Sequence, residues 1–77
     1  MIYDQCTPLE ATEDFMTFEG RSMRRFTKGQ QVWVVSTREE QQRLGTIRIA
    51  RKGKNGATAQ YFNLSDVEGR FRVVPKP

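Results

Sequence analysis

The chain has 77 residues, 29% of them charged, and a formal net charge of +4, so it is expected to form one small domain. It contains one cysteine and no histidine, which excludes an intramolecular disulfide, Cys–His catalysis and histidine-based metal sites. No apolar run approaches the roughly 20 residues of a membrane span, and the N-terminal residues lack the pattern of a secretory signal. We expect a soluble, cytoplasmic protein, because a lone cysteine is typical of a reducing compartment.

The charges are divided unevenly along the chain. Residues 1–20 contain five acids and no base, whereas residues 21–77 contain all thirteen Lys and Arg against four acids. A basic body favours a polyanionic partner, and an acidic segment could compete with that partner. We therefore divide the chain into an acidic N-terminal leader, residues 1–25, and a folded domain, residues 26–77.

The leader allows two interpretations. Thr7, Pro8 and Glu10 have the form of a helix start, with an N-cap, a proline at the first helical position and the acid of a capping box. This pattern predicts one short helix that ends near Gly20. The other interpretation is a partly disordered or loosely docked leader, because residues 11–22 also fit an alternating pattern.

The rest of the chain predicts β structure. Residues 31–36 are rich in β-branched and aromatic side chains and predict a strand. Residues 37–43 are polar throughout and predict an exposed loop or a single helical turn. Residues 44–51 alternate, with Ile47 and Ile49 on one face of a second strand.

A hairpin is predicted next. Asn55-Gly56 ends a basic, glycine-rich turn, and this dipeptide strongly favours a tight hairpin because both residues tolerate positive φ. Residues 57–62 form the returning strand. Residues 63–69 predict a 3₁₀ turn or a tight loop.

The final strand is predicted over residues 70–74. Phe71 and Val73 point inward, and Pro75 and Pro77 end the strand because proline cannot donate to a ladder. Four to five short antiparallel strands joined by tight turns predict a mainly β fold. We expect a small closed or nearly closed barrel, since closure removes exposed sheet edges.

Four segments carry a resemblance to a known group, in the order Lys28–Val34, Gly45–Ile47, Gly53–Phe62 and Leu64–Val67. They look like the glycine-led first strand, the start of the second strand, the central hairpin and the closing 3₁₀ turn of SH3-like small barrels, in particular KOW and Tudor-like ones. The resemblance covers roughly Phe26 to Pro75 and leaves the leader outside. The chain departs from methyl-lysine-reading Tudor modules, because the required set of cage aromatics is not found.

The outward strand positions and the hairpin tip carry the candidate nucleic-acid site. Their bases could contact phosphates, and an aromatic side chain there could stack on a base. The alternative is a solvated face whose long basic side chains cover apolar surface. The candidate nucleic-acid-binding residues are Arg48, Arg51, Lys52, Lys54, Arg70, Arg72, Trp33 and Tyr61.

Two features of this site stay open. Trp33 anchors the core if its own side of the strand faces inward, and it is displayed if Val32 and Val34 face inward. A second basic group could reach along a nucleic-acid backbone, or could pair with the upstream acids and position the leader. This group consists of Arg21, Arg24, Arg25 and Lys28.

The carboxylates form no catalytic constellation, since the adjacent Glu39 and Glu40 do not converge on one site. We expect no enzyme activity, no metal and no cofactor. The leading hypothesis is a small nucleic-acid-binding protein, for DNA or RNA, with a regulatory role. The alternative is a protein-interaction module of the phage or mobile-element type that docks on a larger host protein, and a homodimer is a third hypothesis. The partner-binding residues of the alternative would be Leu9, Phe15, Met16 and Phe18.

Overall fold

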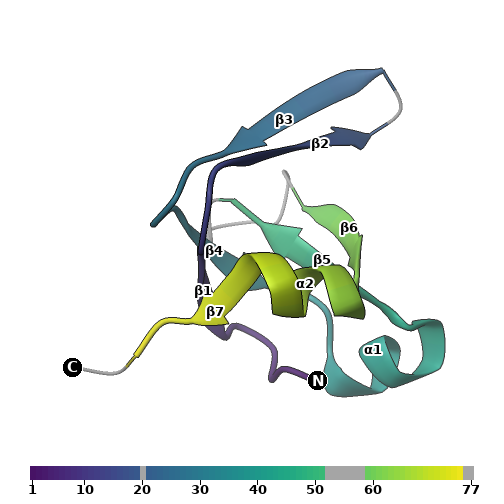
Figure 1. Cartoon of the computed structure of the whole chain (residues 1–77). Coiled ribbons are helices and arrows are strands. Elements are labelled where there is room, and N and C mark those ends of the chain that lie inside the picture. Colours follow the sequence, from purple (N-terminus) through teal and green to yellow (C-terminus); the bar gives the residue numbers. More distant parts are fainter. Residues whose placement is uncertain (20, 52–58, 76–77) are drawn as a thin grey trace.

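The computed structural model of the chain describes residues 1–19, 21–51 and 59–75. Their elements are arranged around one curved sheet (Figure 1). In chain order they are β1 (Pro8–Ala11), β2 (Phe15–Glu19), β3 (Ser22–Phe26), β4 (Gln31–Val34), α1 (Arg38–Leu44), β5 (Thr46–Ala50), β6 (Gln60–Asn63), α2 (Leu64–Arg70) and β7 (Phe71–Val73).

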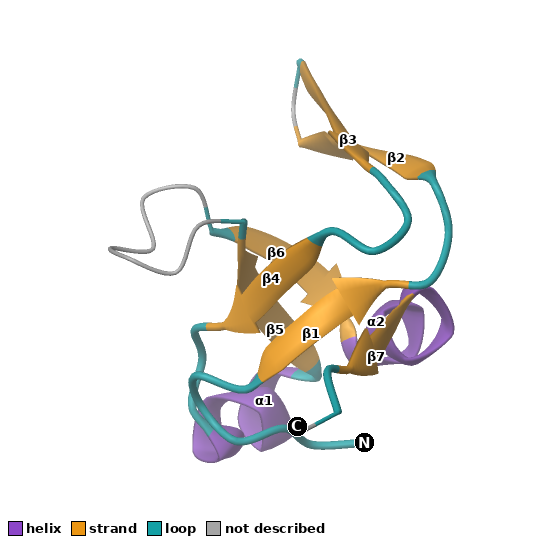
Figure 2. Cartoon of the chain, turned by 90° about the vertical axis from the view of Figure 1, so that its left-hand side faces the viewer, coloured by secondary structure: helices purple, strands orange, loops and turns teal. Residues whose placement is uncertain are grey.

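The main sheet has five antiparallel strands in the order β6-β5-β4-β1-β7 and forms a half-barrel. Helix α2 connects its two edge strands, β6 and β7. Strands β2 and β3 form a separate hairpin that lies over one end of the half-barrel (Figure 2). The prediction of a mainly β, barrel-like fold with four to five antiparallel strands is confirmed.

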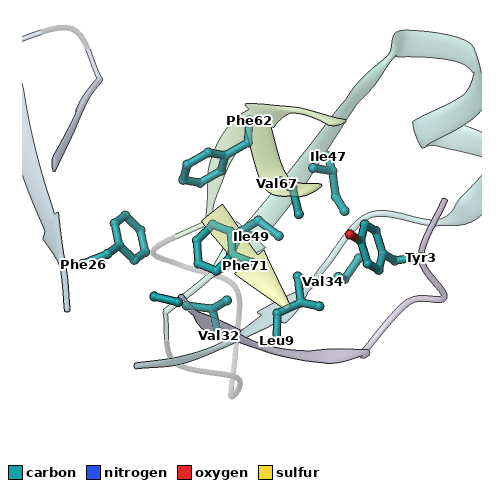
Figure 3. Close-up of a cluster of buried hydrophobic side chains, with 11 residues drawn as sticks. Tyr3, Leu9, Phe26, Val32, Val34, Ile47, Ile49, Phe62, Val67 and Phe71 are labelled. Carbon is teal, nitrogen blue, oxygen red and sulfur yellow. The ribbon is translucent and has the colours of Figure 1, made fainter. Parts of the chain in front are cut away.

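The core follows from the alternation that the sequence shows. Val32 and Val34 of β4 and Ile47 and Ile49 of β5 are buried on the concave side of the sheet (Figure 3). Trp33 therefore lies on the outer face, where it is half-buried. Of the two predicted alternatives for Trp33, in the core or on the outer face, the structure has the second, because only one side of a strand can face the core.

The acidic leader is part of the sheet. Strand β1 lies between β4 and β7, and Leu9 is in register with Val32 on one side and with Val73 on the other. The division at residue 25 therefore does not separate an appendage from a barrel. The predicted helix is wrong as well, because residues 8–11 are extended, with Leu9 and Ala11 buried. Two flanking strands satisfy their backbone groups, and this tertiary pairing overrides the local helix signal.

Helix α1 replaces the predicted loop or single turn. It begins at the N-cap Thr37, whose hydroxyl accepts a hydrogen bond of 3.1 Å from the backbone N–H of Glu40. It ends at Gly45, whose φ of 70° fits the left-handed conformation of a helix C-terminus. The predicted turn at residues 63–69 is likewise a helix, α2, which buries Val67 against the sheet.

One buried side chain of α1 holds the N-terminal segment. The Gln41 Oε1 atom accepts from the backbone N–H of Tyr3 at 2.9 Å, and Gln41 Nε2 donates to the Tyr3 carbonyl at 2.8 Å. Burial of the Tyr3 ring, with a smaller effect from the charge of Glu68, raises the pKa of its phenol above the ordinary value.

The hairpin is attached to the half-barrel by four phenylalanine rings. Phe26 of β3 stacks on Phe15 of β2 at a centroid distance of 4.9 Å. It also meets Phe62 of β6 and Phe71 of β7 edge-on, at 5.9 and 5.7 Å. Such aromatic pairs favour these geometries beyond the area that they bury.

Val73 departs from its predicted inward position. It faces the same side of the sheet as Leu9, its partner in the register, yet it is 48% exposed. The reason is its place at the end of a three-residue edge strand, which has no strand beyond it within the described part of the chain.

The position of β1 gives a stability prediction. We expect Leu9→Ala to lower the free energy of unfolding by about 2–5 kcal/mol, because it leaves a cavity in the core. Urea denaturation at equilibrium measures this loss, and Met16→Ala, at an exposed position, is the control. Equal small effects of the two substitutions would contradict a structural role for the leader.

Candidate functional site

Arg48, the first of the predicted phosphate-binding residues, is held by helix α1. Its Nε and Nη2 atoms contact the two carboxylate oxygens of Glu40 at 3.0 and 3.1 Å. This two-point contact is the strong geometry for a guanidinium with a carboxylate. Both side chains are partly buried, so Arg48 joins α1 to the outer face of β5.

The other described arginines of the predicted site also have intramolecular partners. Arg72 forms an ion pair with Glu10, its neighbour in the β1–β7 register. The Arg51 guanidinium lies 4.9 Å from the centroid of Phe26, and that of Arg70 lies 4.8 Å from the centroid of Phe15. Cations over aromatic faces in this range are attracted to them, so these two arginines cover core rings.

These arginines are not gathered on one surface. Arg48 and Arg72 belong to β5 and β7, which are separated by β4 and β1. Arg51 lies over the ring of Phe26, and Arg70 lies over the ring of Phe15. Lys52 and Lys54 lie outside the described residues. The interpretation as basic side chains that cover apolar surface fits these contacts better than one continuous phosphate-binding face.

The second basic group is divided in the same way. Arg21 and Arg25 are exposed on the hairpin, and Arg24 is half-buried. The backbone N–H of Lys28 donates to the Asp14 carboxylate at 2.7 Å. Two leader acids form ion pairs with arginines further along the chain: Asp4 pairs with Arg38 at 3.1 Å, and Glu10 pairs with Arg72.

Two exposed aromatic residues line one groove. Phe18 of β2 is 73% exposed and Tyr61 of β6 is 60% exposed, and both line an open groove of about 240 Å³ between the hairpin and β6. The groove is lined by Thr17, Phe18, Thr46, Gln60, Tyr61, Phe62, Asn63 and Asp66. Its polar lining consists of hydroxyl, amide and carboxylate groups, without a base among the lining residues.

Gln60 lies at the buried side of this groove and is only 4% exposed. Its Nε2 donates to the Thr17 hydroxyl at 2.7 Å and so connects β6 to the hairpin. Its Oε1 is buried and has no hydrogen-bond partner within the described residues. Buried amide oxygens are nearly always paired, so an unpaired one indicates a site that can accept a further donor.

The sequence did not reveal this groove. From the sequence, Phe18 is predicted to contact a protein partner and Tyr61 to contact nucleic acid. No role is predicted for Gln60, and Asp66 is predicted only to lie in a turn. The sequence pattern contains one part of the signal for this groove. The alternation of β6 predicts that Tyr61 faces away from Phe62, and so toward solvent. The fold of the hairpin over β6 depends on contacts between distant residues.

The residues predicted for the alternative partner site differ in their exposure to solvent. Leu9 is fully buried in the core, so it presents no surface to a partner in the folded protein, and Phe15 is partly buried against the core. Met16 and Phe18 are exposed, as is Met23, which is in register with Phe18 across the hairpin. One side of the hairpin therefore carries three exposed apolar side chains.

No protein-family model matches the chain, and no curated protein or solved structure is significantly similar to it. The SH3-like resemblance therefore stays a prediction. Neither of the helices described here is long and apolar enough to cross a membrane. Among the described residues, no three or more acidic or cysteine side chains gather as metal ligands would.

The contacts of Arg48 predict a structural role for it. We expect Arg48→Met to lower the free energy of unfolding by about 1 kcal/mol, since the partly buried Glu40 loses its partner but remains open to solvent. Thermal or urea denaturation measures this change. Arg25→Met is the matched control, because Arg25 is exposed and makes no ion pair with the described residues. An unchanged stability of Arg48→Met would contradict the role.

Proposed function

We propose that this protein binds single-stranded nucleic acid, DNA or RNA, with bases stacked on Phe18 and Tyr61. One observation carries the proposal: the two exposed aromatic side chains of the described chain line the same groove. Stacking on aromatic rings is the common way in which small β domains hold unpaired bases. A structural role in the core would require these rings to be buried, and they are exposed.

The size of the groove supports a small flat ligand group. Pockets for whole drug-sized ligands measure roughly 300–1,000 Å³, whereas this groove measures about 240 Å³ and is open to solvent. One base of a strand fits such a space, while the neighbouring nucleotides remain outside. The proposal is therefore a binding module that performs no chemistry on the strand.

The charge distribution supplies attraction for the strand. The chain carries +4 overall, and within the described residues Arg38, Arg48 and Arg72 are paired with acids. Arg25 is exposed on the same side of the hairpin as Phe18, two positions away in the register, and Arg21 lies near the hairpin end. Diagonal neighbours on a strand pair lie within reach of long side chains, so Arg25 can contact a phosphate beside a stacked base.

The wider role follows from composition. The single cysteine, Cys6, is exposed and unpaired, which supports action in a reducing compartment such as the cytoplasm. A small module that binds a strand without altering it suits a regulatory role. Lys52 and Lys54 remain candidates for additional phosphate contacts.

Substitution of the two aromatic residues tests the proposal. We expect Phe18→Ala and Tyr61→Ala each to weaken binding of a labelled single strand by about 1–3 kcal/mol, because each removes one stacking surface. Tyr61→Phe keeps the ring and should keep the affinity. Fluorescence anisotropy at about 50 mM salt, with DNA and RNA strands, measures the change.

Leu44→Ala is the control for this test, since Leu44 is exposed but lies outside the groove. The logarithm of the affinity should also fall with the logarithm of the salt concentration, by about 0.7 for each phosphate neutralised. A protein that binds neither strand under these conditions would refute the proposal.

A second copy of the chain is a second candidate partner, favoured by the three exposed apolar side chains on the hairpin. Met16 and Met23 suit an adaptable contact surface because methionine is flexible and polarisable. We expect sedimentation velocity to show association that increases with concentration and that Met16→Ser with Met23→Ser abolishes. The same double variant should leave strand binding unchanged, since neither methionine lines the groove. A monomer at every concentration would contradict this candidate.

A further inference from the structure

We infer that the groove between the hairpin and β6 selects guanine among the bases, through the Asp66 carboxylate and the side-chain amide of Gln60. This inference rests on the proposed binding of a single strand and names the base that the groove prefers. Phe18 and Tyr61 supply stacking, which every base accepts. Selectivity must come from the polar groups that line the same groove.

Asp66 is placed to accept hydrogen bonds from a ligand. It lies in the first turn of α2, it lines the groove and it is exposed. Within the described part of the chain it makes no ion pair or hydrogen bond, whereas Glu10, Glu40 and Glu68 each have a cationic partner. Its two carboxylate oxygens are therefore available as adjacent acceptors.

Gln60 adds a second unpaired group to the same groove. Its Oε1 lacks a partner among the described residues, and its Nε2 is already bonded to Thr17. The Thr17 hydroxyl can either accept or donate, so rotation of the amide would leave Nε2 unpaired instead. In both orientations one atom of the Gln60 amide remains for a ligand, as an acceptor for an N–H group or as a donor to a carbonyl.

The hydrogen-bonding edge of guanine matches the Asp66 carboxylate together with the Gln60 amide in its rotated orientation, in which Nε2 is free to donate to O6. Guanine presents adjacent N1–H and N2–H donors, which fit the two oxygens of one carboxylate, and its O6 is an acceptor. Cytosine and adenine present one amino group beside a ring nitrogen acceptor, which a carboxylate oxygen repels. Thymine and uracil present a single N–H between two carbonyl oxygens. The carboxylate therefore favours guanine over the other four bases.

A cationic ligand would also suit aromatic rings beside a carboxylate. The charge of the whole chain opposes it, because the protein is +4 and the hairpin beside the groove carries the exposed Arg21 and Arg25. An anionic strand gains from the same charges. Charge complementarity therefore favours a base on a nucleic-acid strand.

The test compares strands that differ in one base. The probes are oligothymidylates of about nine nucleotides in which the central thymine is kept or replaced by guanine, hypoxanthine, adenine or cytosine. We expect the guanine strand to bind at least about fivefold more tightly than the all-thymine strand. Hypoxanthine lacks the amino group at C2, so its strand should lose most of this preference.

Asp66→Asn is the test variant, because it keeps the shape of the side chain but replaces one acceptor with a donor. It should abolish the preference for guanine while the all-thymine strand binds as before or slightly more tightly. Glu39→Gln removes one exposed negative charge outside the groove and should leave the preference intact. The ratio of two affinities within one variant does not depend on the folded fraction.

The outcomes separate this inference from the proposed function. Equal affinities for all five strands, or a guanine preference that persists in Asp66→Asn, would overturn guanine selection while strand binding stands. Failure to bind any strand would overturn both. Asp66-dependent binding of a lysine-rich peptide in place of the strands would likewise overturn both and identify a cationic ligand.

Discussion

The packing of Phe26 is the contact on which the rest of the structure depends. Its ring is fully buried and meets rings from β2, β6 and β7. The hairpin forms its own two-stranded sheet, so these rings, together with the Thr17–Gln60 hydrogen bond, fix its position over the half-barrel. The groove beside Phe18 exists only because this packing holds β2 close to β6.

Features that depend on local sequence patterns could be predicted, whereas features that depend on contacts between distant residues could not. Alternation placed Ile47 and Ile49 correctly, because a strand reports its own buried face. In the preceding strand it left open whether Trp33 or the pair Val32 and Val34 faces the core. The leader was misassigned because a proline and a capping pair give a local helix signal, whereas strand β1 is stabilised by β4 and β7. The groove was missed for the same reason, since Phe18 and Tyr61 are brought together only by the fold.

Some acids and bases that lie far apart in the sequence form ion pairs in the folded protein. Glu10 and Asp4 of the acidic segment pair with Arg72 and Arg38, and Glu40 pairs with Arg48. These three acids therefore neutralise basic groups on the body of the protein. Among the described residues, exposed bases without an ion pair lie on the hairpin, at Arg21 and Arg25, and elsewhere, at Lys28 and Arg43.

The side chain of Gln41 acts as a substitute for a peptide group. Its amide offers one donor and one acceptor to the backbone of Tyr3, as a neighbouring strand would, although it belongs to a helix. Glutamate has the same shape but only acceptors when it is ionised, so it would leave the Tyr3 carbonyl unpaired in the interior. The amino acid at this position is thus restricted by hydrogen-bond polarity, not by volume.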